Sequence, residues 1–179
     1  MDFGVISVLL ILGFLAVYFT VYFVYAFFYV VLPMIYWGAF FAKTDDVSVE
    51  NMMKLAEIKS GDIAVDLGSG DGKIVIAMAK AGAIAYGLEI NPFLVWLSKR
   101  KIKKAGLLGK AFILQKDFWK EDLSKYDVIM MFQLSHVMAS LEKKLDRELK
   151  PGARVLAKYF VFPNWKAKEN LGMVNLYIK

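Results

Sequence analysis

The chain begins with a long hydrophobic segment that carries no charge. No charged residue occurs between Asp2 and Lys43, and Ser7 and Thr20 are the only polar side chains there apart from tyrosines. A helix of roughly 20 apolar residues is enough to cross the hydrocarbon layer of a bilayer. A secretory signal peptide begins with basic residues and has an apolar region of only roughly 7–15 residues, which this segment does not match. We expect one tilted transmembrane helix that is broken near Pro33, with a buried core helix as the alternative.

The basic residues are confined to the rest of the chain. The net charge is +6, and all 23 lysines and arginines follow residue 42. Lys43, Lys54 and Lys59 flank the hydrophobic segment on its carboxyl side, and the positive-inside rule then places that side in the cytoplasm. The absence of cysteine fits a reducing compartment. We therefore predict a single-pass membrane protein with an anchor over residues 1–42 and a cytoplasmic domain over residues 43–179.

Aromatic residues mark the second half of the hydrophobic segment. Tyr18, Tyr22, Tyr25 and Tyr29 recur at a spacing that brings them to one face of a helix. The stretch 36–41 adds further aromatic rings at the position expected for the inner membrane interface. The tyrosine face is open to two interpretations, which are packing against lipid and recognition of a helix in a partner protein.

The domain alternates between strand and helix patterns. A short amphipathic helix capped by Ser48 precedes the alternation, and Asn91, Pro92 and Gly106 are start and stop signals of a later helix. We predict strands over 63–69, 83–90, 111–117, 126–133, 152–160 and 173–179, and helices over 72–82, 91–106 and 135–149. This order is typical of an α/β fold with a mostly parallel sheet and helices on both faces.

A glycine-rich turn, "VDLGSGDGK" over residues 65–73, follows the first strand. A P-loop requires a wider glycine spacing than Gly68 to Gly72, and it has a hydroxyl residue where this chain has Ile74. A dinucleotide loop has a third glycine where this chain has Lys73, and Asp71 would repel a pyrophosphate. Neither phosphate-binding loop fits.

The same turn resembles motif I of the class I methyltransferases that use S-adenosylmethionine. The pattern D-x-G-x-G-x-G is formed by Asp66, Gly68, Gly70 and Gly72, with Ser69 and Asp71 between the glycines. This cofactor has a sulfonium cation and no phosphate, so nearby carboxylates favour its binding. The glycines let the backbone approach the ligand closely. We expect these six residues to bind the cofactor, and we expect no metal ion.

Two acidic residues follow the next strands. Glu89 ends the second strand, where a carboxylate can accept hydrogen bonds from both ribose hydroxyls. Asp117 ends the third strand and resembles the residue of these methyltransferases that accepts the adenine amino group, with Phe118 beside the ring. The cofactor site is therefore expected to extend across three strand ends.

Longer stretches resemble one family of small membrane-anchored protein-lysine methyltransferases. They include residues 65–101, "KDFWKEDLSKYDVIMMF", "LEKKLDRELKPGARVLAKYF" and "FPNW", within about residues 47 to 165. Members occur in archaea and mitochondria, where relatives modify the ATP synthase c-subunit and the adenine nucleotide translocase. The resemblance implies a Rossmann-like class I methyltransferase fold. Only one strand is expected after Phe160, where the family usually has two, so we predict a shortened C-terminal end.

The acceptor side is less clearly marked. A lysine amine must lose its proton before transfer, which costs ~4.6 kcal/mol at pH 7, and burial near a cation lowers its pKa without a dedicated base. Gln133, Tyr159 and Trp165 are candidates to orient the amine, although core packing accounts equally well for Tyr159. His136 is a candidate catalytic residue because it is the only histidine and starts a predicted helix.

The leading hypothesis is transfer of a methyl group from S-adenosylmethionine to a lysine of a membrane protein, next to the bilayer. A methyltransferase for a membrane lipid or quinone and a non-catalytic cofactor-binding or scaffold protein are the alternatives. Nucleic-acid methyltransferases generally have an (Asp/Asn)-Pro-Pro-aromatic motif where this chain has "FQLS", so no nucleic-acid partner is expected. The basic stretch "SKRKIKK" is interpreted as a solvated helix face or as a site of attraction to anionic lipid.

Overall fold

The computed structural model describes residues 2–28 and 42–179. The chain divides into two compact units, Met1–Ala42 and Lys43–Lys179, which we describe separately. The expected break at Pro33, the aromatic stretch 36–41 and Tyr29 of the tyrosine face lie outside the described residues.

The first unit contains one long helix, α1 (Phe3–Ala26), none of whose residues is buried. Among the described helices, α1 alone is long and apolar enough to cross a membrane. The Ser7 hydroxyl donates to the Phe3 carbonyl (3.0 Å) and the Thr20 hydroxyl donates to the Ala16 carbonyl (2.8 Å). Both hydroxyls are thus satisfied within the helix, which is what an apolar surrounding requires.

The second unit is an α/β domain with one seven-stranded sheet, in the order β3-β2-β1-β4-β5-β7-β6. Strands β1 to β5 are parallel to their neighbours, whereas β7 is antiparallel to β5 and β6. The strands are β1 (Ile63–Leu67), β2 (Ile84–Glu89), β3 (Ala111–Gln115), β4 (Val128–Met131), β5 (Arg154–Lys158), β6 (Glu169–Leu171) and β7 (Val174–Ile178). The helices are α3 (Asp46–Ala56), α4 (Lys73–Lys80), α5 (Pro92–Lys104) and α6 (Ser135–Glu148), with the short 3-10 helix η2 (Phe118–Lys120).

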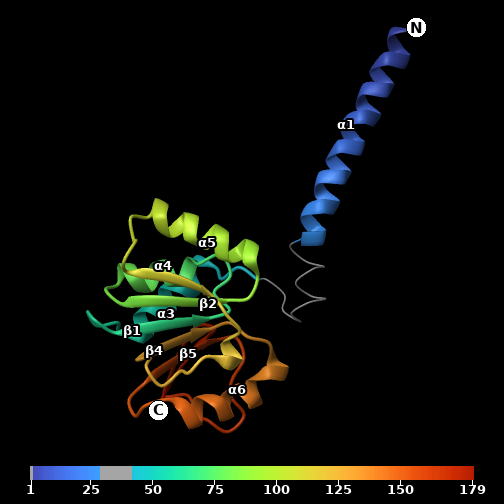
Figure 1. Ribbon diagram of the computed structural model, residues 1–179. Coiled ribbons are helices and arrows are strands. Elements are labelled where there is room, and N and C mark those ends of the chain that lie inside the picture. The colour runs from blue at the N-terminus through green and yellow to red at the C-terminus, as the bar shows by residue number, and fades with distance from the viewer. Residues whose placement is uncertain (1, 29–41) are drawn as a thin grey trace. The chain divides into compact units, whose positions relative to one another are not determined.

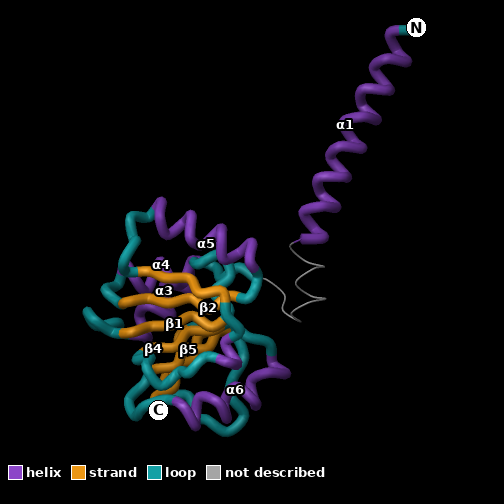
Figure 2. Tube along the Cα trace, viewed as in Figure 1, coloured by secondary structure: helices purple, strands orange, loops and turns teal. Residues whose placement is uncertain are grey.

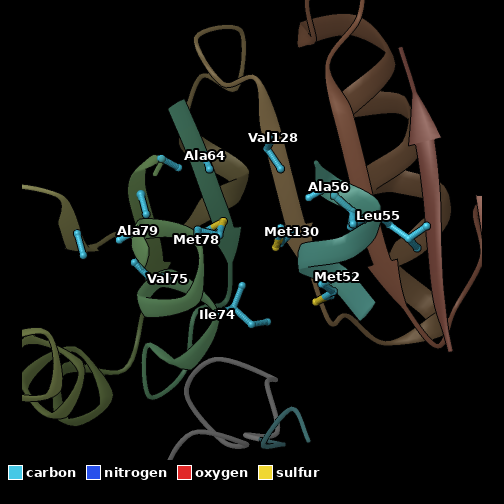
Figure 3. Packing of buried hydrophobic residues seen from close by; sticks show 14 of the residues in the cluster. Met52, Leu55, Ala56, Ala64, Ile74, Val75, Met78, Ala79, Val128 and Met130 are labelled. Atoms are coloured by element: carbon cyan, nitrogen blue, oxygen red, sulfur yellow. The ribbon is translucent and has the colours of Figure 1, made fainter. Parts of the chain in front are cut away.

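Helices cover both faces of the sheet, as predicted (Figures 1 and 2). On one face α3, α4 and α5 pack against alternate residues of the strands, and Figure 3 shows part of this cluster, with Met52, Met78 and Met130 among its side chains. On the other face α6 packs through Met138, Leu141 and Leu145. The period-two alternation of the strands sends successive side chains to the two cores, so Asp66 in β1 lies on the face covered by α4.

Two expectations about local structure are wrong. The chain has two strands after Phe160, because the short strand β6 pairs with β7, and the C-terminal end of the sheet is therefore complete. Helix α3 is capped by Asp45 rather than Ser48, since the Asp45 carboxylate accepts hydrogen bonds from both the amide (2.8 Å) and the hydroxyl (2.7 Å) of Ser48. The signals at Asn91 and Pro92 act as predicted at the start of α5.

The parallel strands give the domain two different edges. We call the loops that follow β1 to β5 the carboxyl edge; they are residues 68–72, 90–91, 116–117, 132–134 and 159–162. We call the segments that precede these strands the amino edge; they are residues 57–62, 81–83, 105–110, 124–127 and 150–153. In open α/β sheets the ligand binds at the carboxyl ends of the strands.

Candidate functional site

The glycine loop has a backbone that only glycine adopts readily. Gly68, Gly70 and Gly72 have φ values of 76°, 52° and 79°, in the left-handed region. The amides of Gly68 and Ser69 both donate to the carbonyl of Leu88 in β2, at 2.9 and 3.0 Å. The loop therefore folds back over the end of the neighbouring strand and is fixed there.

Helix α5 holds the loop from the other side. The hydroxyl of Ser98, which is fully buried, donates to the Gly70 carbonyl at 2.8 Å. The Lys101 ammonium pairs with the Asp71 carboxylate at 2.6 Å. A Cβ added at Gly72 would lie 2.9 Å from the Cβ of Ser98, so this glycine is required by close packing as well as by its φ value. Asp71, predicted to bind the cofactor, is thus engaged in anchoring the loop.

Glu89 links the loop to the end of β2. Its Oε2 accepts a hydrogen bond from the Gly70 amide and its Oε1 accepts one from the Asn91 amide, both at 2.8 Å. Burial raises the pKa of Glu89, and these amides offset part of the shift. Each oxygen retains a further lone pair, so hydrogen bonds from ribose hydroxyls remain compatible with this geometry.

Asp66 is the most deeply buried carboxyl group of the site. It lies opposite Gly87 in the register of β1 and β2 and is only 2% exposed. Burial raises its pKa to about 8, and the Glu89 and Asp71 carboxylates add to the shift. None of the ion pairs within residues 42–179 includes Asp66 or Glu89. Two buried carboxyl groups without a cation suit a positively charged ligand.

Ser69 adds a neutral polar group to the same place. Its hydroxyl oxygen is buried and has no hydrogen-bond partner among the described residues. A Cβ at Gly87 would lie only 2.5 Å from this oxygen, so Gly87 makes the space that the hydroxyl occupies. Unsatisfied buried hydroxyls are rare in folded proteins and need a reason. The free Ser69 hydroxyl and two buried carboxyl groups that pair with no cation fit S-adenosylmethionine and do not fit a phosphate ligand.

The end of β3 forms the next part of the edge. Gln115 pairs with Glu89 in the sheet, so Asp117 and Phe118 follow on the same edge. Asp117 caps η2 by accepting a hydrogen bond from the Trp119 amide at 3.0 Å, and Phe118 is half-buried. Their roles next to adenine stay predictions that this position permits.

The end of β4 brings Gln133 to the glycine loop. Its Nε2 donates to the Leu67 carbonyl at 2.6 Å and would lie 3.0 Å from a Cβ at Gly68. Next to it, the rings of Phe132 and Tyr159 are stacked with centroids 6.2 Å apart. Tyr159 is 56% exposed and has a φ of 74°, an uncommon backbone for a residue with a side chain. The carboxyl edge thus joins Gln133 and Tyr159, which were predicted to face the acceptor.

The other two residues predicted on the acceptor side are Trp165 and His136, and their roles stay predictions. Trp165 packs against Phe162 and Tyr177, at centroid distances of 5.6 and 5.5 Å. Tyr177 pairs with Val155 near the amino end of β5, so the position of Trp165 is accounted for by the core under α6. His136 is exposed in the first turn of α6.

A set of contacts that the sequence analysis missed fixes the start of the domain. Lys73 Nζ donates to the Thr44 carbonyl at 2.7 Å and pairs with Asp46 at 2.8 Å, and Lys158 Nζ pairs with Asp45 at 2.8 Å. We call these five residues the entry clamp. The hydrogen bond from Lys158, with those from Ser48, holds the pKa of Asp45 well below its ordinary value. Lys158 is buried and its ammonium lies 4.6 Å from the Phe132 ring centroid, so the clamp contacts the acceptor side.

The sequence contains only one weak signal for the entry clamp. Lys158 ends the otherwise apolar strand pattern "VLAKYF", and a buried lysine needs a carboxylate partner. That partner lies 113 residues away in the chain, so no local pattern identifies it.

Comparisons with known proteins find similarity to methyltransferases. The model of the ANTKMT methyltransferase domain matches residues 66–169. A lysine N-methyltransferase of the ATP synthase c-subunit, from Rattus norvegicus, is 44% identical over 124 residues, covering 69% of this chain and 57% of that protein. A protein-lysine N-methyltransferase from Saccharolobus islandicus is 37% identical over 131 residues, covering 72% of this chain and 81% of that protein. The chain thus spans little more than half the length of the rat relative.

A solved structure is similar over most of the domain. The crystal structure of an RNA methyltransferase from Salinibacter ruber, in complex with S-adenosyl-L-homocysteine, has a TM-score of 0.71 and 32% identity. The match covers 76% of this chain and 91% of that chain. The predicted class I methyltransferase fold is confirmed.

Proposed function

Because the chain belongs to the family of ANTKMT methyltransferase domains, we propose that it transfers a methyl group from S-adenosylmethionine to a lysine amine of a protein. The observation that carries this proposal is the pair of buried carboxyl groups at the glycine loop, Asp66 and Glu89, neither of which pairs with a cation. Relatives named as lysine methyltransferases support the choice of acceptor.

Different residues of the carboxyl edge bind different parts of the cofactor in this proposal. Asp66 and Glu89 hold the charged and hydroxyl groups of the cofactor, the Ser69 hydroxyl gains a partner, and Asp117 and Phe118 hold the adenine. Bound in this way, the cofactor supplies an electrophilic methyl group on a sulfonium ion. Ser98 and Lys101 act indirectly, because they fix the backbone of the loop through Gly70 and Asp71.

The acceptor enters beside the fourth and fifth strands. Tyr159, which stacks on Phe132, presents an exposed ring, and aromatic rings attract an ammonium group. Gln133 donates its amide hydrogen to Leu67, which leaves its carbonyl oxygen able to accept a hydrogen bond from the amine. Apolar surroundings lower the pKa of the amine and favour its reactive neutral form.

The membrane part of the proposal rests on α1. Its 24 uncharged and mostly apolar residues fit a membrane anchor, and the lysines that follow it fit a cytoplasmic domain. We propose that the acceptor lysine belongs to a membrane protein, as expected for an enzyme held at the bilayer. A membrane lipid or quinone as acceptor remains the alternative from the same arrangement.

A second candidate function is methylation of RNA. The similarity to the Salinibacter ruber enzyme favours it, and α5 exposes basic side chains at Lys99, Arg100, Lys103 and Lys104. Against it stands the chain's similarity to relatives that act on proteins.

One experiment separates these possibilities. The full chain in its membrane is incubated with cofactor labelled in the methyl group, and protein, lipid and RNA are then separated. We expect the label in protein, on lysine when peptides are analysed by mass spectrometry. The Asp66→Asn variant should lose the labelling, whereas Asp146→Asn, the same change at an exposed site of α6, should retain it. Label in lipid or RNA would select the corresponding alternative, and cofactor binding without any label would favour the non-catalytic one.

A further inference from the structure

Large apolar side chains are exposed along the carboxyl edge of the domain. Six of them form what we call the apolar rim: Phe93, Trp96, Trp119, Leu134, Tyr159 and Val161, with exposed fractions from 39% to 60%. Phe93 and Trp96 belong to the first turns of α5 after β2, and the others follow β3, β4 and β5. The segments that follow four strands therefore each present exposed apolar side chains near the carboxyl edge.

From this arrangement we propose that the apolar rim docks on the surface of a lipid bilayer, so that the candidate site opens toward the headgroups. The proposal rests on the proposed function for its membrane location, and it adds which face of the domain meets the lipid. Tryptophan and tyrosine rings are the side chains that favour the membrane–water interface, and contiguous exposed apolar patches mark interaction surfaces.

Basic residues next to the rim fit this partner. Lys99 and Arg100 are exposed one turn further along α5, and Lys120 is exposed beside Trp119. The guanidinium of Arg100 lies 4.8 Å from the Trp96 ring centroid, so cation and ring are presented together. Anionic lipid headgroups attract such cations while the rings enter the interface.

The amino edge has the opposite character. It contains a cleft lined by charged residues, among them Glu57, Lys59, Asp62, Asp127, Lys150 and Arg154. Bringing these charges to a hydrocarbon boundary would cost desolvation energy. Ile84, the first residue of β2, and Leu108, which precedes β3, are exposed apolar residues at the amino ends of these strands and serve as controls.

The segment that precedes α3 is attached at the carboxyl edge, which is also the edge of the apolar rim. The entry clamp ties Thr44, Asp45 and Asp46 to Lys73, the first residue of α4, and to Lys158, the last residue of β5. Both lysines lie at the carboxyl edge. Residues 44–46, at the start of the second unit, are therefore fixed beside the carboxyl edge.

This docking narrows the class of acceptor. A site whose opening faces the headgroups receives lysines at the membrane–water boundary of another membrane protein more readily than lysines of soluble proteins. Confinement of enzyme and acceptor to one layer also raises their effective concentration.

The test uses the absence of cysteine from the sequence. A single cysteine is introduced at Val161 in the rim or at Leu108 at the amino edge, which are 60% and 67% exposed. Each full-length variant is labelled with an environment-sensitive fluorophore and reconstituted into vesicles of zwitterionic and anionic lipid that carry a quencher at the headgroup level. We expect a blue shift and at least threefold stronger quenching at Val161 than at Leu108. Equal quenching at the two positions would overturn the proposal.

Two further outcomes separate this proposal from the proposed function. Quenching at Val161 that requires a co-reconstituted acceptor protein would mean that the rim binds protein rather than lipid, and would overturn it. If acceptor lysines are methylated at the normal rate while the fluorophore at Val161 stays in water, the docking proposal is wrong and the proposed function still holds. Failure of the full chain to enter vesicles would remove both the anchor and the docking.

A rate measurement completes the design. The Val161→Glu substitution should lower the rate on a membrane-embedded acceptor about tenfold while leaving the affinity for the cofactor unchanged. The matched Leu108→Glu substitution should change neither quantity. Equal rates for the two variants would contradict a role of the rim in reaching the acceptor.

Discussion

The two edges of the sheet treat the same kind of side chain in opposite ways. At the amino edge, Asp62 pairs with Arg154 at 2.5 Å, and Asp127 pairs with Lys150 at 2.6 Å. At the carboxyl edge, Asp66 and Glu89 are buried without such a partner. Asp62 directly precedes β1, and Asp66 lies near the carboxyl end of the same strand. The two side chains are chemically identical, so their environments determine that one is paired and the other is not.

The pKa values follow this division. Although burial alone would raise the pKa of Asp127, the Lys150 ammonium and the Ile63 amide hold it below its ordinary value. At the other end of β1, burial raises the pKa of Asp66. Paired carboxylates stabilise the fold, whereas unpaired buried ones destabilise it and are typical of functional sites. The carboxyl edge therefore keeps buried carboxyl groups that suit a cationic ligand, at a cost to stability.

The largest expected effect is in the pH dependence of stability. The pKa of Asp66 is about 8 in the folded protein against an ordinary value of 3.8, so the folded state binds more protons between these limits. The free energy of unfolding then falls as the pH rises through this window, by up to ~1.4 kcal/mol per pH unit from this group. We expect Asp66→Asn to remove that slope and to be more stable than the parent at pH 8. Urea denaturation of the ligand-free protein at several pH values measures it, and parallel slopes would contradict the assignment.

The same variant should lose most of its affinity for the cofactor. Loss of the ionisable Asp66 carboxyl group is expected to weaken S-adenosylmethionine binding about 100-fold, which corresponds to about 2.7 kcal/mol. Glu89→Ala should weaken binding in the same direction, since it removes the acceptor of the Gly70 amide as well. Titration calorimetry gives the affinities. NADH and ATP should give no comparable heat. Tight binding of NADH that is unchanged in Glu89→Ala would contradict the cofactor assignment.

The corresponding change at the amino edge should act only on stability. Asp62→Asn leaves Arg154 bonded to the carbonyls of Ala56 and Glu57 but removes its carboxylate. We expect a loss of about 2 kcal/mol in the free energy of unfolding, with cofactor affinity unchanged at a temperature where the variant is folded. Asp146→Asn at the surface is the control. A large loss of affinity in Asp62→Asn would break the division between the edges.

The smallest effect is expected where α5 supports the loop. Ser98→Ala removes the hydrogen bond to the Gly70 carbonyl, for an expected loss of about 1 kcal/mol in stability. Cofactor affinity should fall a few-fold, because the Gly70 amide also donates a hydrogen bond to the Glu89 carboxylate. Ser140→Ala, at an exposed position of α6, should change neither. An unchanged affinity in Ser98→Ala would show that the loop keeps its shape without α5.

Much of the fold was predictable because its signals are local. The strands β1 to β5 are mostly apolar runs, and the glycine and Asn-Pro signals between them mark turns and caps directly. Strand β6 was missed because all three of its residues are exposed, so it has no hydrophobic pattern. The cap of α3 was misassigned because Asp45 and Ser48 are equally good capping residues, and tertiary contact with Lys158 accompanies the one that is used.

The site was predictable only in part, for a related reason. Asp66, Glu89 and the glycines belong to a compact motif, and the structure brings them to one edge. The partners of the loop and the entry clamp come from distant segments: Ser98 lies 28 residues from Gly70, and Lys158 lies 113 residues from Asp45. Trp165 packs on Phe162 and Tyr177, which no local pattern indicates, and its role toward the acceptor stays a prediction.

The backbone at Tyr159 has a consequence for protein engineering. A residue with a side chain at a φ of 74° is strained by roughly 1 kcal/mol relative to glycine. A search for thermostable variants would therefore favour glycine at this position, and the change would remove the ring that stacks on Phe132. Selection for heat resistance and selection for turnover would pull this one position in opposite directions.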